Sequence, residues 1–282
     1  MSQEASAALL ERTIPSTGER VPAVGLGTWQ AFDVGGSAAE RASLAAVLRR
    51  FVDLGGRVLD SSPMYGAAEA VVGDLAGELG VNDSLFLATK VWTSGRDAGL
   101  AQMEQSCRRL RRRRLDLLQV HNLLDWRTHL DTLRQWKQAG RVRYVGVTHY
   151  TASAYDELAR ILRTEPLDFV QVNYSPGEPE AERRILPLAQ DRGVAVLVNR
   201  PFSAGGLFQR ARGRPLPGWA VELGCESWAQ VFLKWILAHP AVTCVIPATR
   251  RPEHLVDNLQ AGLGSLPDTA ARARVLAVVA SR

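Results

Sequence analysis

The sequence predicts an α/β protein with a (β/α)8 barrel, and three observations support this fold class. Eight short apolar runs end in polar or Gly-rich turns, and stretches with the apolar spacing of helices lie between them. The last residues of successive runs are 26 to 33 positions apart in six of seven cases, which suits βα units of roughly 30 residues. The runs are almost continuously apolar, as expected of parallel strands that are buried on both faces.

The expected elements follow in chain order. The strands are Ala23–Gly27, Arg57–Asp60, Leu85–Lys90, Leu115–His121, Arg143–Val147, Asp168–Asn173, Ala195–Arg200 and Val242–Pro247. The clearest amphipathic helices are Ala38–Leu54, Gly99–Leu110, Leu130–Gln138, Ala152–Leu162 and Ser227–Ala238. Before the first strand, Thr13–Pro22 predicts a β-hairpin that turns at Thr17 and Gly18 and closes the barrel bottom. The one long interval contains Ser203–Gly218, rich in Gly, Pro and Arg, which predicts a mobile loop over the barrel mouth.

Length and composition favour a single domain that spans residues 1–282, because a chain with 46% hydrophobic residues can bury one large core. The formal charge of +5 does not by itself require a polyanionic partner. An arginine-rich run, Arg108–Arg114, is interrupted by Leu110 and is expected at the end of a solvated outer helix that leads into a strand, so no nucleic-acid partner is predicted.

The sequence lacks the patterns that would indicate disulfides, a bound metal or a membrane partner. The cysteines, Cys107, Cys225 and Cys244, are far apart and predict neither a disulfide framework nor a zinc site. His121, His129 and Asp125 are not accompanied by further ligands at a recognised spacing, so no metal is expected. The sequence has no signal-peptide pattern and no run of eighteen apolar residues, which favours a cytoplasmic protein without a membrane partner.

Four reactive side chains lie at the expected ends of three successive strands, where barrel enzymes place their chemistry. Asp60 closes the second strand, Tyr65 follows it in the turn SPMYG, Lys90 closes the third in LATKVW, and His121 closes the fourth in LLQVHN. The ammonium of Lys90 is expected to lower the pKa of the Tyr65 phenol. Asp60 would hold Lys90 in place, and His121 would donate a hydrogen bond to a carbonyl substrate. The set therefore suits proton transfer to a carbonyl oxygen.

Each of the four also has a structural explanation when it is taken singly. Asp60 would be a helix cap, Tyr65 a rim aromatic, Lys90 a solvated strand end and His121 a loop histidine. Their joint occurrence on three successive strand ends favours the chemical interpretation. The lysine adds to this, because only three of the 34 cationic residues are lysines and one of the three stands at this position.

These motifs, with GLGTW at the first strand and GVTHY at the fifth, resemble the aldo-keto reductase superfamily from about Thr13 to about Gln260. The resemblance implies that Asp60, Tyr65, Lys90 and His121 form the catalytic tetrad, with Tyr65 as the general acid. It also implies that NADPH binds in an extended form across the barrel mouth and reduces an aldehyde or ketone to an alcohol by hydride transfer. No GxGxxG motif is present, in agreement with a family that has no Rossmann domain.

The segment after the eighth strand points to the cofactor independently. It reads CVIPATRRPEHLVDN and precedes a helix whose N-terminal amides suit an anion. Arg250 and Arg251 favour a 2′-phosphate, so NADPH is expected rather than NADH. The alternative is that the two arginines cap or solvate the last helix. By the resemblance, Asp257 and Asn258 fall where an acid and an amide meet adenine.

The residues expected to hold the nicotinamide depart from the family pattern. Thr148 and His149 stand where many relatives have Ser-Asn, and Gln171 matches a glutamine near the carboxamide. Asn199 and Arg200 occur where relatives often place a stacking tyrosine, so either Arg200 supplies the planar surface or the stacking partner is lost. The full set expected to contact the cofactor is Thr28, Trp29, Asp60, Thr148, His149, Gln171, Asn199, Arg200, Pro201, Phe202, Pro247, Thr249, Arg250, Arg251, Asp257 and Asn258.

The substrate is expected to be a small carbonyl compound in an open site. Trp29, Met64 and Trp92 flank the site and would make its walls apolar, although rim packing is the alternative. Two other functions remain open: a regulatory barrel that senses NADPH with little turnover, and a barrel lyase or isomerase that uses Tyr65 and Lys90 without nicotinamide. The sequence leaves the physiological substrate, the direction of reaction and the oligomeric state undetermined.

Overall fold

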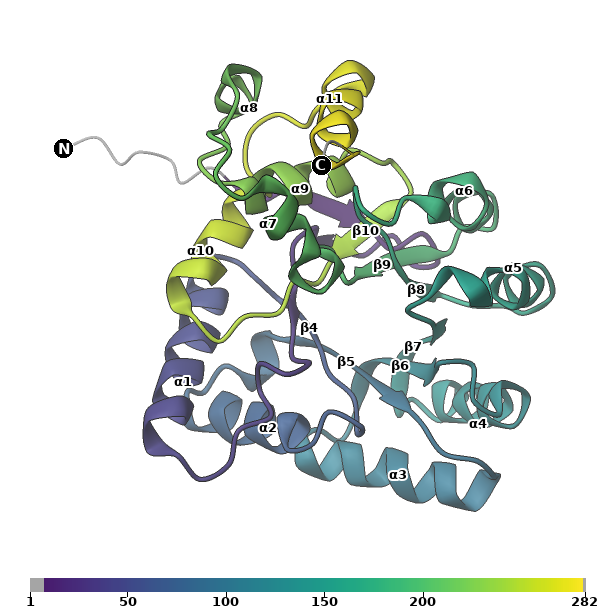
Figure 1. The fold of residues 1–282 in the computed structure, drawn as a ribbon. Helices are drawn as coiled ribbons and strands as arrows, with labels where there is room; N and C mark the ends of the chain where they lie inside the picture. The colour runs from purple at the N-terminus through teal and green to yellow at the C-terminus, as the bar shows by residue number, and fades with distance from the viewer. Residues whose placement is uncertain (1–7, 281–282) are drawn as a thin grey trace.

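The computed structural model describes residues 8–280 and shows a parallel eight-stranded barrel surrounded by helices (Figure 1). The strands are β3 (Leu26–Gly27), β4 (Val58–Asp60), β5 (Phe86–Val91), β6 (Leu115–His121), β7 (Val142–Thr148), β8 (Phe169–Asn173), β9 (Ala195–Asn199) and β10 (Val242–Val245). The helices are α1 (Ala38–Asp53), α2 (Ala68–Glu78), α3 (Arg96–Arg109), α4 (Trp126–Gln138), α5 (Tyr155–Thr164), α6 (Ile185–Asp191), α7 (Gly206–Ala211), α8 (Gly218–Glu222), α9 (Trp228–Leu237), α10 (Pro252–Gln260) and α11 (Thr269–Ala280). Four short 3-10 helices are η1 (Asn82–Ser84), η2 (Ala152–Ala154), η3 (Glu180–Arg183) and η4 (Ser203–Gly205). The predicted fold class is confirmed.

The barrel closes where the first and last strands meet. Strands β3 to β10 pair in chain order, and the closing contact is made by backbone hydrogen bonds from Gly25 N–H to Val245 O and from Val245 N–H to Ala23 O. This contact consists of isolated bridges, so the first strand is shorter than the predicted Ala23–Gly27. Gly25 is required here, because a Cβ at this position would lie 2.6 Å from the carbonyl oxygen of Val58.

The barrel bottom is closed by the predicted hairpin. Strands β1 (Glu11–Thr13) and β2 (Arg20–Pro22) pair antiparallel, with Gly18 in the turn at a φ of +78°. From this hairpin Ile14 and Val21 enter the buried cluster inside the barrel, which contains Phe86 and Tyr144. The hairpin prediction is therefore confirmed, and burial of these two apolar side chains explains why the segment folds onto the barrel.

The segment Ser203–Gly218 differs from its prediction as a loop. It contains η4 and α7, and the side chain of Leu207 from α7 is fully buried. Gly205 precedes α7 and Gly213 follows it closely, where glycine is favoured, whereas Pro215 and Pro217 lie in the irregular stretch before α8. Smaller differences occur at strand ends: β9 stops at Asn199 and β10 at Val245, before Arg200 and Pro247.

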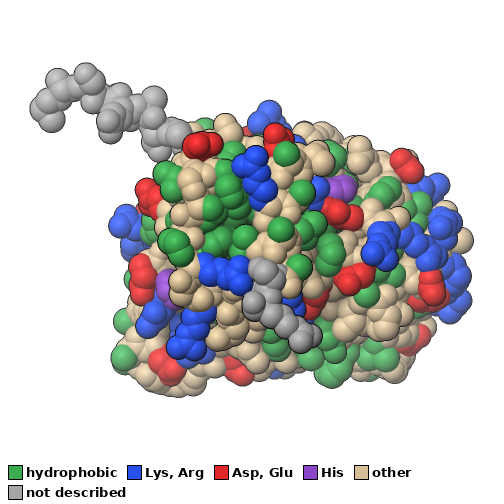
Figure 2. All heavy atoms as spheres, turned by 45° about the horizontal axis from the view of Figure 1, so that its top comes forward, with side chains coloured by type: hydrophobic (Ala, Val, Ile, Leu, Met, Phe, Trp, Pro, Cys, Tyr) green, Lys and Arg blue, Asp and Glu red, His purple; other side chains and the backbone are tan. Residues whose placement is uncertain are grey.

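The arginine-rich run lies at the end of an outer helix that leads into a strand, as expected. Helix α3 ends at Arg109, and the following arginines occupy the turn before β6. There Arg111 pairs with Asp74, and Arg112 with Asp116, so part of the positive charge is balanced locally. Acidic and basic side chains are interspersed on the face shown in Figure 2. No helix within residues 8–280 combines the length and the apolar character that crossing a membrane requires.

Candidate active site

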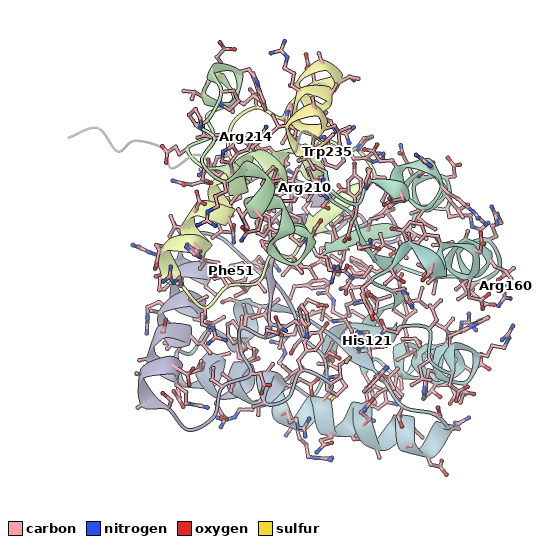
Figure 3. The ribbon with its side chains drawn as sticks, viewed as in Figure 1. Phe51, His121, Arg160, Arg210, Arg214 and Trp235 are labelled. Carbon is pink, nitrogen blue, oxygen red and sulfur yellow. The ribbon has the colours of Figure 1, made fainter. Side chains whose placement is uncertain are left out.

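The four predicted catalytic residues meet at one mouth of the barrel. Asp60 ends β4, Lys90 lies one residue before the end of β5, and His121 ends β6, while Tyr65 lies in the turn between β4 and α2. Figure 3 shows His121 toward the middle of the barrel, far inside the ring of helices. Neighbouring parallel strands end at the same edge, which explains how residues distant in sequence come together.

Lys90 is fully buried and is held by two acceptors. Its Nζ donates to Asp60 Oδ2 at 2.6 Å and to the carbonyl oxygen of Ser61 at 2.6 Å. Burial by itself lowers the pKa of an ammonium, but the negative charge of Asp60 and its hydrogen bond act the other way, and the pKa of Lys90 is raised. Lys90 therefore stays charged, as predicted, and its Nζ lies 5.1 Å from the ring centre of Tyr65.

The predicted lowering of the Tyr65 pKa is wrong. Removal of the phenol from water raises its pKa, and this effect exceeds the opposing effect of the Lys90 ammonium, so that the net direction is upward. The sequence indicated the correct sign for the effect of Lys90 but contained no measure of burial. A raised pKa keeps Tyr65 protonated at neutral pH, which is the form that a proton donor needs.

His121 lies between two aromatic rings and is neutral. Its ring is edge-on to Tyr65, with centroids 5.9 Å apart, and lies 6.4 Å from the ring of Trp92. Burial, with the nearby charge of Lys90, lowers the pKa of His121 to about 2. The Nδ1 atom lies 3.0 Å from the hydroxyl of Ser62. The imidazole can therefore donate one hydrogen bond without becoming charged.

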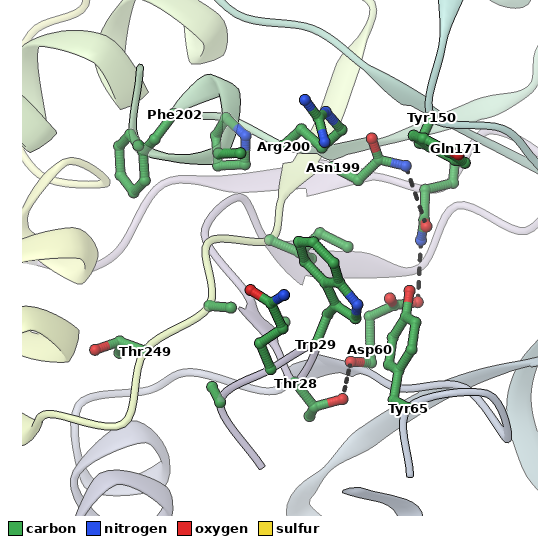
Figure 4. Close-up of a pocket in the computed structure, with 18 of the residues that line it drawn as sticks. Thr28, Trp29, Asp60, Tyr65, Tyr150, Gln171, Asn199, Arg200, Phe202 and Thr249 are labelled. Carbon is green, nitrogen blue, oxygen red and sulfur yellow. Dashed lines mark hydrogen bonds between the residues drawn. The ribbon is translucent and has the colours of Figure 1, made fainter. Parts of the chain in front are cut away.

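A cavity of about 770 Å³ connects this site to the loop after β10. Figure 4 shows its wall, where Gln171 links Asn199 to Asp60. The Gln171 amide donates to Asp60 Oδ1 at 3.0 Å, and its oxygen accepts from Thr148 at 3.1 Å. The Oδ1 atom of Asn199 is buried without a hydrogen-bond partner. A hydrogen-bond donor on a bound ligand would give this buried acceptor the partner that it lacks.

The far end of the cavity carries two arginines, whose charges are partly balanced by Glu40 and Glu253. Arg250 and Arg251 line it just before α10, and Arg251 occupies the N-cap position of that helix. The Arg250 guanidinium donates to the carbonyl oxygen of Gln30 at 2.7 Å, whereas the side chain of Arg251 is 63% exposed. A helix N-terminus beside two guanidinium groups suits a phosphate.

Apolar side chains form the outer walls. Among residues 8–280, seven large hydrophobic side chains are exposed, and five of them line this cavity. They include the predicted substrate contacts and two others: Trp29, Met64, Trp92, Tyr150 and Phe208. Exposed apolar surface concentrated in a cavity is typical of a ligand-binding site.

The remaining predicted residues divide into two groups. The cavity is also lined by Thr28, Arg200, Pro201, Phe202 and Thr249, in addition to those described above. It is not lined by Lys90, His149, Pro247, Asp257 or Asn258. Asp257 accepts hydrogen bonds from Ser227 and Gln230 at the start of α9, and the Nδ1 of His149 accepts from Thr151 N–H. The roles of these residues toward a cofactor stay predictions.

Sequence reasoning missed several residues of the site. Ser62 contacts His121, and Tyr150 stands in the GVTHY motif, but neither was assigned a role. Ser62 opens the SPMYG turn, so its closeness to a strand end was the available signal. Phe208 had no signal, because it lies on the helix that was predicted as a loop. No group of three metal-ligating side chains occurs within residues 8–280.

Comparison with known proteins shows the family of the chain. The sequence model of the Aldo/keto reductase family matches residues 23–273. Methylglyoxal reductase YeaE of Escherichia coli is 29% identical over 248 residues, which cover 84% of each chain. Two aldo-keto reductase structures from Klebsiella pneumoniae, one in complex with NADP and acetate and the other with NADPH, have TM-scores of 0.77 and 0.78 at 27% and 26% identity. They cover 92% and 95% of this chain, which covers 91% and 94% of theirs.

The barrel, the four residues at its mouth and these relatives define the class of protein, which is an oxidoreductase. The chain belongs to the aldo/keto reductase family.

Proposed function

We propose that this protein reduces an aldehyde or ketone to an alcohol with NADPH, and that Tyr65 donates the proton. The observation that carries the proposal is the arrangement around the phenol. A buried ion pair, Lys90 with Asp60, lies beneath Tyr65, and the neutral ring of His121 lies at its edge. This arrangement offers a proton donor, a charge that stabilises the donor after transfer, and a second hydrogen-bond donor.

The residues that are present suit NADPH. The cavity runs from Tyr65 to Arg251, and Asn199 offers an unpaired buried acceptor near its catalytic end. Arg250, Arg251 and the N-terminus of α10 would hold the 2′-phosphate, which NADH lacks. NADP or NADPH is bound in the two Klebsiella structures, which supports the same cofactor here.

NADPH, when bound, would supply a hydride for the carbonyl carbon. Tyr65 gives its phenolic proton to the carbonyl oxygen, so the product is a neutral alcohol and the phenol becomes a phenolate. The ammonium of Lys90 stabilises that phenolate, and Asp60 keeps the ammonium in place. Solvent then returns a proton to Tyr65. His121 donates a hydrogen bond that orients the carbonyl group and polarises it.

We further propose that the preferred substrates carry an aromatic or other bulky apolar group. Trp29, Met64 and Trp92 provide apolar surface beside the catalytic residues, and this surface is exposed to the cavity. A two- or three-carbon carbonyl compound would leave most of it in contact with water. Burial of a larger substrate against these walls is therefore favourable.

Binding and turnover distinguish this proposal from its alternatives. NADPH is titrated while tryptophan fluorescence is recorded, since Trp29 and Trp92 lie at the cavity. Turnover is then measured with a panel of aldehydes. We expect saturable binding and turnover. Binding without turnover would indicate the sensor, and failure to bind either nicotinamide cofactor would exclude both of these functions and leave the lyase or isomerase.

The role of Tyr65 is tested by Tyr65→Phe. We expect at least about a hundredfold lower kcat with little change in NADPH affinity, because only the general acid is removed. Tyr144→Phe is the matched control, since Tyr144 is a buried phenol inside the barrel near the hairpin and does not line the cavity. Activity of Tyr65→Phe close to that of the wild type would refute the assigned role.

The substrate class is tested by Trp92→Ala with benzaldehyde and methylglyoxal. Loss of about 1 kcal/mol of apolar contact predicts a kcat/KM about fivefold lower for benzaldehyde and almost unchanged for methylglyoxal. Val221→Ala serves as the control, because Val221 is exposed but lies outside the cavity. An equal loss for both aldehydes would contradict the proposed apolar wall.

A further inference from the structure

Ser62 is a buried residue that the proposed reaction has not yet used. It lies two residues after the end of β4 and is fully buried. Its Oγ is 3.0 Å from His121 Nδ1 and 3.4 Å from the backbone nitrogen of Met64. These are the two hydrogen bonds of the Ser62 side chain within residues 8–280, so both partners of its hydroxyl group are known.

The placement of hydrogens follows from these two contacts. The Met64 N–H can only donate, so Ser62 Oγ accepts from it. The hydroxyl hydrogen of Ser62 then has one acceptor within reach, which is His121 Nδ1. If Nδ1 carried the imidazole proton instead, the buried hydroxyl would have no acceptor, which is unfavourable.

Two further observations concern the protonation and the orientation of the His121 ring. The pKa of His121 is lowered to about 2, chiefly by burial, so the imidazole carries a single proton. The rings of Tyr65 and Trp92 lie close to the imidazole, within 5.9 and 6.4 Å. With Nδ1 directed to Ser62, Nε2 is the nitrogen left to face the cavity.

We propose that Ser62 is a positioning residue that holds His121 in the tautomer with its proton on Nε2. The cavity-facing nitrogen is then a donor, as a carbonyl oxygen requires. In the other tautomer Nε2 would present a lone pair to that oxygen and repel it. This inference rests on the proposed function for its catalytic meaning, but the tautomer is a property of the protein by itself.

The tautomer is measured directly by ¹⁵N NMR of the imidazole nitrogens in uniformly labelled protein without cofactor. The His121 signals are assigned by their absence from the spectrum of His121→Asn. We expect a protonated Nε2 and an unprotonated Nδ1 in the wild type, and a shift toward the other tautomer in Ser62→Ala. Ser62→Thr keeps the hydroxyl and should keep the wild-type pattern.

Ser61→Ala is the matched control, because Ser61 is equally buried but its hydroxyl pairs with Thr28 instead of His121. Its His121 signals should not change. A wild-type spectrum with the proton on Nδ1, or an unchanged tautomer in Ser62→Ala, would overturn the inference. Both results are obtained without NADPH. A failure of this inference can therefore be distinguished from a failure of the proposed function, which the binding and turnover assays test.

Kinetics then test whether Ser62 acts through His121. Ser62→Ala should lower kcat about fivefold, which corresponds to the loss of one hydrogen bond. In a His121→Asn background the same substitution should have almost no effect, because the residue that it positions is gone. Equal effects in both backgrounds would contradict a role through His121, and Ser62→Thr should restore most of kcat.

Discussion

Replacement of Lys90 by Met would separate the structural role of the buried ion pair from its chemical role. Lys90 and the Asp60 side chain are almost fully buried, and their charged atoms lie 2.6 Å apart. Met has a similar length and no charge, so Lys90→Met removes the ammonium without opening a large cavity. Within residues 8–280, the Asp60 carboxylate then keeps one hydrogen bond, from the Gln171 amide.

The expected loss of stability follows from the burial of both groups. Removal of one member of a buried ion pair costs about 3–5 kcal/mol, because the other charge is left unpaired. For a chain of this length, that loss lowers Tm by roughly 6–10 °C. In the double variant Asp60→Asn with Lys90→Met, no charge remains unpaired, so we expect at least about half of the lost stability to return.

The assay combines calorimetry with turnover. Both variants should lose at least about a hundredfold in kcat, since no ammonium stabilises the Tyr65 phenolate. The double variant should therefore regain stability without regaining activity. If Lys90→Met and the double variant were equally stable, the reasoning about an unpaired buried charge would be refuted.

A second ion pair in the chain provides a matched control. Lys137 Nζ lies 2.6 Å from Asp168 Oδ2, the same distance as between Lys90 Nζ and Asp60 Oδ2. The Lys137 side chain is 42% exposed, whereas that of Lys90 is 0% exposed. Asp168 itself is 6% exposed, but it keeps the hydrogen bond from the backbone N–H of Val145, and the Lys137 end of the pair is open to water. Lys137→Met should therefore cost only about 1 kcal/mol. A cost as large as that of Lys90→Met would show that burial does not decide the difference.

Three other outcomes are expected. Arg251→Ala should raise the Kd for NADPH about fivefold and leave NADH binding within about twofold, because only NADPH carries the 2′-phosphate. His121→Asn should make the free energy of unfolding less sensitive to acid. His121 takes up a proton near pH 2 in the folded protein and near pH 6.5 in the unfolded chain, so acid favours the unfolded state. Urea unfolding at each pH should show that the wild type loses about 2 kcal/mol more stability than the variant between pH 6.5 and 5. Gly25→Ala should destabilise the barrel by about 2 kcal/mol in urea unfolding, since its Cβ would meet the Val58 carbonyl.

Each of these predictions has a control variant or a result that would contradict it. Arg163→Ala removes an exposed arginine outside the cavity and should leave both affinities unchanged; an equal effect of Arg251→Ala on NADPH and NADH would oppose the phosphate assignment. Parallel pH profiles of the wild type and His121→Asn would contradict the neutral folded histidine. Gly35→Ala is the control for Gly25, because nothing lies within 4 Å of its added Cβ.

Much of the fold was predictable because barrel strands leave a local signal. Each strand is a short run that is apolar throughout, so its place can be recognised without knowledge of its neighbours. The run Leu115–His121 matches β6 at both ends. Segments with weaker patterns were less predictable: α7 was expected as a loop, since its burial through Leu207 depends on the elements that pack against it.

The sequence by itself determined the family, the barrel and the identity of the four residues at its mouth, because strand ends and motifs are local features of the chain. Only the tertiary structure decided how those residues behave. Burial raises the pKa of Tyr65 although Lys90 opposes it, and Ser62 meets His121 across 59 positions of sequence. Asp257, whose contact with the cofactor stays a prediction, accepts hydrogen bonds from Gln230 of α9 and from Ser227, the residue before that helix. Desolvation and hydrogen-bond partners depend on distances between elements, and these distances are fixed only when the barrel closes.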